Sequence, residues 1–76
     1  MKQTIKQYIA DKIVGEEIEI TDDTLLSDII DSIGLVKLLA FLAEKYNLSI
    51  DSGDITTENF DTINQIAEFV RKKTTI

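Results

Sequence analysis

The stretch from Ser32 to Tyr46 restricts the possible folds most, because it predicts a helix that is apolar around most of its circumference. At about 3.6 residues per turn, its apolar side chains cover an arc of roughly 220°. A helix on a protein surface needs only about half of that arc. The stretch therefore predicts either a helix at the centre of a bundle or a helix whose remaining apolar face meets a partner.

Phe41 differs from the other apolar residues of this helix. It falls among the polar positions Gly34, Lys37, Glu44 and Lys45, where a large apolar side chain has no core to enter. We therefore expect Phe41 to contact a partner, whereas most of the apolar arc packs against other helices.

Packing alone has to stabilise this helix. The chain has 76 residues and contains neither cysteine nor histidine, so disulfides and ordinary zinc sites cannot support the fold. Hydrophobic residues make up 43% of the chain but aromatic residues only 7%, which predicts an aliphatic core. We expect residues 1–76 to form one all-α domain, a small helical bundle.

The first helix is predicted by isoleucines that recur every four residues, at Ile5, Ile9 and Ile13. Thr4 and Gln7 have the spacing of a capping box at its start, and Gly15 marks its end.

The later elements carry similar signals. Asn47 is expected to stop the helix that begins at Ser32, and a short helical turn is expected over residues 56–60. Thr62 and Gln65 have capping-box spacing ahead of a last amphipathic helix, which we expect to fray at residues 71–73.

A long acidic loop joins the first two helices. Leu25, Leu26, Ile29 and Ile30 are expected to anchor this loop to the core. No basic residue lies between Ile13 and Val36, whereas seven acidic residues do, and the chain as a whole carries a net charge of −6. This charge argues against nucleic acid and favours partners with basic surfaces.

Several functions are excluded by what the sequence lacks. Without histidine or cysteine there is no catalytic triad, and three scattered glycines make no phosphate loop, so we expect no enzyme. A calcium loop counted from Asp51 would have Thr56 and Thr62 where glycine and glutamate are needed, so we expect no metal site. No apolar run suits a membrane span or a signal peptide, which predicts a cytoplasmic protein without membrane contact.

Asp31 and Ser32 precede the apolar helix and allow two interpretations. Both are common N-cap residues. However, the third residue after Ser32 is Leu35, so no capping box fixes the hydroxyl group, and a helix N-terminus favours a phosphate. A serine at this position is suited to carry a phosphodiester.

The run DSIGLVKLLAFLAEKYNLSI, the acidic loop before it and the later FDTI ahead of a final amphipathic helix resemble the acyl carrier and peptidyl carrier protein family. The resemblance covers nearly the whole chain. It implies a four-helix bundle with a short third helix, and a covalent 4′-phosphopantetheine that a separate transferase attaches to Ser32, with Asp31 as its motif partner. The arm would hold an acyl or aminoacyl group as a thioester and present it to loading and downstream enzymes. A recognition face around the arm is expected from Asp31, Ile33, Gly34, Leu35, Lys37, Leu38 and Phe41, with Ile55 and Thr56 from the third helix.

Departures from the family pattern narrow the expected cargo. Carriers of fatty-acid synthesis typically have an acidic second helix, whereas residues 33–46 contain two lysines and one glutamate. Gly34, Leu35 and Phe41 make the surroundings of Ser32 more apolar, and the usual proline after the second helix is absent. We therefore favour an aminoacyl or peptidyl carrier of secondary-metabolite biosynthesis, loaded by an adenylating enzyme, over a carrier of fatty-acid or polyketide synthesis.

An alternative of another class is a helical adaptor without a prosthetic group. It would bind its partner through Phe41 and Leu38, with Ser32 serving as an ordinary cap. In either case the charge and the lack of a long apolar seam predict a monomer.

Overall fold

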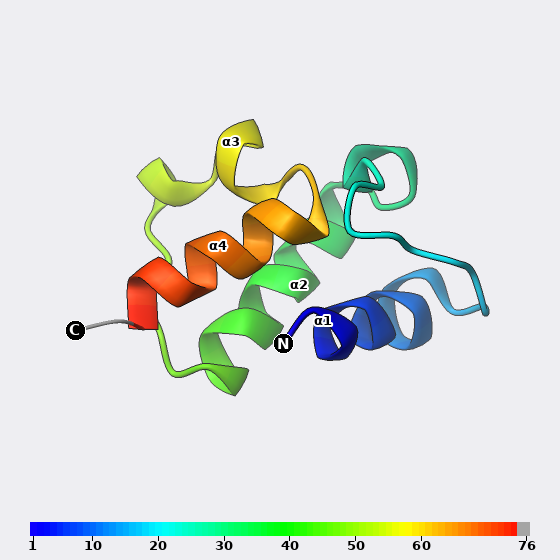
Figure 1. Ribbon diagram of the computed structural model, residues 1–76, viewed down its shortest axis with the longest axis horizontal. Coiled ribbons are helices and arrows are strands. Elements are labelled where there is room, and N and C mark those ends of the chain that lie inside the picture. Colours follow the sequence, from blue (N-terminus) through cyan, green and yellow to red (C-terminus); the bar gives the residue numbers. More distant parts are fainter. Residues whose placement is uncertain (75–76) are drawn as a thin grey trace.

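The computed structural model describes residues 1–74, which form helices and connecting loops and no strand (Figure 1). The α-helices are α1 (Lys2–Tyr8), α2 (Ser32–Lys45), α3 (Thr57–Phe60) and α4 (Ile63–Thr74). A π-helical stretch, Ile9–Val14, continues α1, and 3₁₀ turns cover Leu26–Asp28 and Ser52–Asp54. The prediction of an all-α bundle with a long first loop and a short third helix is confirmed.

The first helical segment ends where the sequence predicts. Ile5 and Ile9 are fully buried, and Gly15 adopts a left-handed conformation with φ of +81° while its N–H donates to the Ala10 carbonyl at 2.9 Å. The predicted capping box at Thr4 is wrong, because the helix already begins at Lys2 and Thr4 lies inside it.

The loop between α1 and α2 is fixed at several points. Leu26 is buried, and its N–H donates to the Asp61 carbonyl at 2.8 Å. Asn64 holds the preceding turn, because its N–H donates to the Asp22 carbonyl at 3.1 Å and its side chain donates to Asp23 at 2.9 Å. Leu25 does not anchor the loop as predicted, since 47% of it is exposed.

The same loop is also held to α1 by charge. The Asp22 carboxylate lies 2.7 Å from the Lys6 ammonium and 3.4 Å from that of Lys2. The Lys6 ammonium is the main cause of a lowered pKa at Asp22, and Lys2 adds to it. The loop is therefore fixed to both α1 and α4.

α2 is only partly a central helix. Leu38 and Leu42 are fully buried, and Asn47 follows the helix with φ of +53°, which confirms the predicted stop. In contrast, Ile33 and Val36 are 67% and 64% exposed. One stripe of the apolar arc therefore remains at the surface near the start of the helix.

Phe41 contacts the first helix instead of lying without an intramolecular partner. Its ring stacks on Tyr8, with centroids 4.0 Å apart and planes inclined by 14°. The expectation that Phe41 has no core to enter was wrong, because α1 covers this side of α2. A helical-wheel projection of one helix does not show where a second helix packs against it.

α4 packs against α1 and α3 and completes the core with Ile63, Ile66, Phe69 and Val70. Its predicted capping box is confirmed, since Thr62 N–H donates to Gln65 Oε1 at 3.0 Å and Gln65 N–H donates to Thr62 Oγ1 at 3.2 Å. The helix continues through Thr74 and does not fray at residues 71–73 as expected.

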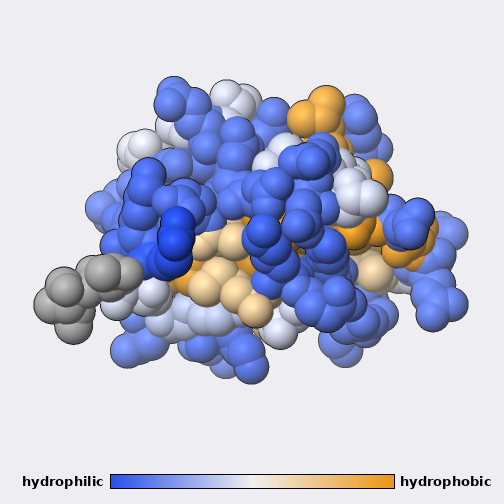
Figure 2. Space-filling model, viewed as in Figure 1, coloured by the Kyte–Doolittle hydropathy of each residue, from blue (hydrophilic) through white to orange (hydrophobic). Residues whose placement is uncertain are grey.

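The surface is mainly polar. Figure 2 shows one face that is mostly hydrophilic, where apolar residues reach the surface at separate places. Among the helices of residues 1–74, none has the length and apolar character needed to cross a membrane.

Candidate functional site

Asp31 is the residue that caps α2. Its backbone is extended, and its Oδ1 accepts a hydrogen bond from the Gly34 N–H at 2.8 Å. A carboxylate in this position satisfies one of the free amides at the helix start and interacts favourably with the helix dipole. The cap that the sequence allowed at either residue is therefore formed by Asp31.

Ser32 is the first residue inside α2, and the helix start does not use its hydroxyl group. The residue is exposed, and its Oγ makes no hydrogen bond to any other part of residues 1–74. The first turn of the helix after Asp31 contains no acidic residue. An exposed hydroxyl beside free helix amides fits a phosphodiester, so these residues suit the phosphate end of a phosphopantetheine group.

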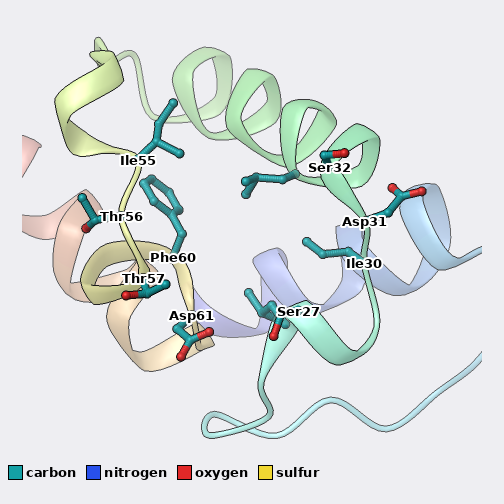
Figure 3. Close-up of a pocket in the computed structure, with 11 residues that line it drawn as sticks. Ser27, Ile30, Asp31, Ser32, Ile55, Thr56, Thr57, Phe60 and Asp61 are labelled. Atoms are coloured by element: carbon teal, nitrogen blue, oxygen red, sulfur yellow. The ribbon is translucent and has the colours of Figure 1, made fainter.

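A groove of about 330 Å³ opens beside Ser32, bounded by the 3₁₀ turn Leu26–Asp28, the start of α2 and the α3 segment (Figure 3). Its floor is apolar and consists of Leu26, Ile30, Leu35, Ile55 and Phe60. Hydroxyl and carboxylate side chains complete the lining, from Ser27, Asp31, Ser32, Thr56, Thr57 and Asp61. The groove can therefore hold an apolar group and offer hydrogen bonds at its edges.

Hydrogen bonds hold the α3 side of the groove in place. Asn59 donates to the Asp54 carbonyl at 2.8 Å, and the Asp54 carboxylate accepts from the Asp51 N–H at 3.0 Å and meets Lys73 of α4 at 2.9 Å. The Asp51 N–H, followed by Lys73, lowers the pKa of Asp54, and Asp54 raises the pKa of Lys73. Ile55, which follows Asp54 and lines the groove, is thereby held in place.

Five of the predicted recognition residues lie at or near the surface. Ile33, Lys37, Ile55 and Thr56 are exposed, and Leu35 is half-buried in the groove. Val36 belongs to the same exposed stripe but was missed, because its place on the helical wheel lies within the arc that we expected the other helices to cover.

Three other predicted recognition residues require correction. Gly34 is buried, and Leu38 is fully buried, so neither offers a surface to a partner. Phe41 stacks on Tyr8 and lies nine residues after Ser32, which places it about half a turn around the helix from the serine. The adaptor alternative, which docked a partner through Leu38 and Phe41, loses its principal contact.

Within residues 1–74, no cluster of histidine, cysteine, aspartate or glutamate side chains could hold a metal ion. The groove beside Ser32 is defined by its apolar floor and by the hydroxyl and carboxylate side chains around it.

Comparison with known proteins identifies the type of site. Residues 3–70 match the family model described as a phosphopantetheine attachment site. The chain is 36% identical over 72 residues to an acyl carrier protein of Desulforapulum autotrophicum, covering 91% of each chain. It is 33% identical over 76 residues to an acyl carrier protein of Clostridium perfringens, covering 97% of each.

A relative with a different printed name is also similar. The chain is 28% identical over 67 residues to a D-alanyl carrier protein of Streptococcus suis, covering 87% of this chain and 85% of that one. Members of the family carry a covalently attached 4′-phosphopantetheine, act as carriers and not as enzymes, and interact with phosphopantetheinyl transferases and acyl-handling enzymes. The chain belongs to the acyl carrier protein family.

Proposed function

We propose that Ser32 is the attachment residue and that this carrier presents aminoacyl groups to partner enzymes. One observation carries the assignment of the serine: Asp31 caps α2, which leaves the Ser32 hydroxyl exposed and without a hydrogen bond within residues 1–74. A hydroxyl that the fold does not use can be modified without loss of a structural contact.

The attachment transfers a phosphopantetheinyl group from coenzyme A. Ser32 Oγ forms a bond to the β-phosphorus, adenosine 3′,5′-bisphosphate leaves, and the serine proton passes to a base of the transferase. The attached group supplies a thiol that holds the cargo as a thioester. This chain contributes the helix amides beside the phosphate and the surface around it.

The surface beside Ser32 supports an aminoacyl cargo and an adenylating enzyme of secondary-metabolite synthesis as the loading partner. Ile33 and Val36 expose apolar side chains, and Lys37 lies on the same helix, so the helix itself is not an acidic docking surface. The printed name of the D-alanyl carrier relative gives a precedent for an aminoacyl cargo in the family.

A second candidate is a carrier of acyl groups in fatty-acid or polyketide synthesis. The printed names of the Desulforapulum and Clostridium relatives favour it. The two candidates differ in the loading enzyme that the chain accepts. If the chain is an aminoacyl carrier, the modified protein should gain mass on incubation with adenylating enzymes, ATP and amino acids. If it is an acyl carrier of fatty-acid or polyketide synthesis, it should gain mass with malonyl transferases and malonyl-coenzyme A.

The attachment is tested by intact mass after incubation with coenzyme A, magnesium and a phosphopantetheinyl transferase of broad specificity. We expect a gain of one phosphopantetheine unit in the wild type and none in Ser32→Ala. Ser27→Ala is the matched control, because Ser27 is an exposed serine that lines the same groove, and it should gain the full mass.

Unfolding by urea tests whether Ser32→Ala fails to gain mass because it lacks the hydroxyl group or because it is unfolded. Because Asp31 is the cap, Ser32→Ala should lie within about 0.5 kcal/mol of the wild type. Asp31→Ala should lose about 1 kcal/mol. Modification of Ser32→Ala, or an unmodified wild type that is folded, contradicts the assignment.

A further inference from the structure

Residues 51–56, which we call the strap, precede α3 and have little support from the core. All of them are exposed except Asp54, which is half-buried. The nearest anchors on either side are Ile50, which packs against the core, and the buried Phe60. The 3₁₀ turn Ser52–Asp54 also lacks the close packing that α3 has against α4. A segment with so little burial opens more easily than the helices around it.

The strap is joined to the rest of the molecule at few points. The N–H groups of residues 54–56 donate to carbonyls inside the strap, and the carbonyls of Asp54 and Thr56 accept from α3. Within residues 1–74, one hydrogen bond or ion pair joins the strap to an element other than α3. It is the pair between the Asp54 carboxylate and the Lys73 ammonium of α4, at 2.9 Å. The strap is therefore fastened to α4 through a single lysine.

This ion pair is better shielded than a typical pair on a protein surface. The side chains of Asp54 and Lys73 are 24% and 32% exposed, against 47% and 68% for the pair of Glu68 and Arg71. Partly buried pairs are screened less by salt than exposed ones. The Lys73 ammonium also lies 5.7 Å from the centre of the Phe69 ring, which is buried. Lys73 therefore connects the strap to a fixed point of the core.

We propose that Lys73 is a positioning residue, which through Asp54 holds Ile55 and Thr56 in the surface that partner enzymes meet around Ser32. The inference rests on the proposed attachment to Ser32. Figure 3 shows Ile55 and Thr56 across the groove from Ser32, and all three residues line it. A standard interface buries about 800 Å² on each partner, a patch about 16 Å in radius. An enzyme that acts on Ser32 therefore also covers the strap.

The fastening of the strap affects binding through entropy. A strap that is released from α4 has to be ordered again when an enzyme covers it, and the cost of this ordering weakens association. A strap that is already held avoids the cost. Lys73 lies outside the groove lining, so it acts on the surface beside Ser32 only through Asp54.

The first test measures backbone order parameters by ¹⁵N relaxation in the folded protein. In Lys73→Gln, the amides of residues 54–56 should fall from about 0.85, the value of rigid backbone, to about 0.6. Leu38 and Leu42, which are fully buried in α2, should keep the wild-type value because the change is local. Unchanged order parameters in the strap would overturn the inference.

Three further variants test whether the ion pair is the cause. Lys73→Arg keeps a cation that pairs with carboxylates and should behave as the wild type. Asp54→Asn keeps an oxygen that can accept the Asp51 N–H but loses the charge, so it should loosen the strap as Lys73→Gln does. Lys72→Gln is the matched control, because Lys72 is an exposed lysine of α4 outside the ion pairs of residues 1–74, and it should change nothing.

The second test measures the kinetics of a phosphopantetheinyl transferase with each carrier. Lys73→Gln should raise the KM for the carrier at least about twofold and leave kcat unchanged, because the lost order affects binding and not the transfer step. Asp54→Asn should raise KM equally although it changes the net charge in the opposite direction. Lys73→Arg and Lys72→Gln should keep the wild-type KM.

The outcomes distinguish this inference from the proposed function. If Ser32 gains the arm but Lys73→Gln has the KM of the wild type, Lys73 is not a positioning residue while the carrier function stands. Opposite changes of KM in Lys73→Gln and Asp54→Asn would assign the effect to net charge and also overturn the inference. If Ser32→Ala gains the arm as the wild type does, the proposed function is itself wrong.

Discussion

At the scale of single residues, Gly34 sets how closely the end of the first helix approaches α2. A Cβ atom at this position would lie 2.8 Å from Ile13 Cγ2 and 3.1 Å from Ile30 Cβ. Both neighbours are β-branched isoleucines, which have little rotamer freedom with which to move away. The sequence places Gly34 beside Ser32 and suggests recognition, but the structure shows that its role is close packing.

Gly34→Ala should therefore destabilise the protein although alanine favours helix. Overpacking costs about 1–3 kcal/mol, and the gain in helix propensity returns about 1 kcal/mol, so we expect a net loss of about 1 kcal/mol in urea unfolding. Gly53→Ala is the control, because no atom lies within 4 Å of its added Cβ, and it should be close to neutral. If Gly34→Ala is neutral or stabilising, Ile13 and Ile30 can move away from the added methyl group without a cost in stability.

At the scale of elements, helices were more predictable than their starting points. The Thr62 capping box formed and the Thr4 box did not, although both have the same spacing. The chain before Thr62 is fixed, because Leu26 N–H bonds to the Asp61 carbonyl, and the helix must start there. Before Thr4 the helix extends back to Lys2, and the Ile5 N–H bonds to the Met1 carbonyl.

The acidic loop was predictable in its length and charge but not in its attachments. Asp22 pairs with Lys2 and Lys6, which lie far before it in the chain. Sequence spacing predicts contacts only between residues three or four apart on one helix, so it could not predict these pairs. The groove beside Ser32 could not be predicted for the same reason, because its walls come from three separate segments. Ser32 and Asp31 could be proposed as site residues from the sequence because the motif that contains them is contiguous.

Asp22→Asn should make the protein less sensitive to acid. The pKa of Asp22 is lowered in the folded protein, so between its folded and unfolded pKa values the unfolded chain binds more protons. The Asp22 contribution is thus fully present above its unfolded pKa of about 4 and is lost as the pH falls through the lower, folded pKa. The stability difference between wild type and Asp22→Asn, measured by urea unfolding, should shrink between about pH 6 and pH 3.

The matched control for this comparison is Glu16→Gln. Glu16 is an exposed carboxylate of the same loop, and no ion pair within residues 1–74 includes it. Its stability difference from the wild type should not show the same loss in acid. A constant difference for Asp22→Asn would mean that its ion pairs contribute nothing to the fold.

At the scale of the whole molecule, excess negative charge opposes folding. The chain carries a net charge of −6, and its longest dimension is 35 Å. The Debye length is about 30 Å at 0.01 M salt and about 3 Å at 1 M, so at low salt most charges in the molecule interact and at high salt only neighbours do. Salt should therefore weaken repulsion more than it weakens the few close ion pairs.

We expect the thermal midpoint to rise by about 4–8 °C between 0.01 M and 1 M sodium chloride, equivalent to about 1 kcal/mol. The triple variant Glu16→Gln, Glu17→Gln and Glu19→Gln removes three exposed carboxylates and should respond less. An equal rise in both proteins would attribute the effect to general salting-out instead of charge repulsion.

The separation of the cap residue from the serine has one more consequence. Because Asp31 makes the hydrogen bond that starts α2, this bond does not depend on the chemical state of residue 32. With the arm on Ser32, as proposed, the bare and modified proteins would start α2 in the same way. An enzyme that must tell them apart would then have to recognise the arm and its cargo, since the start of the helix would look the same to it.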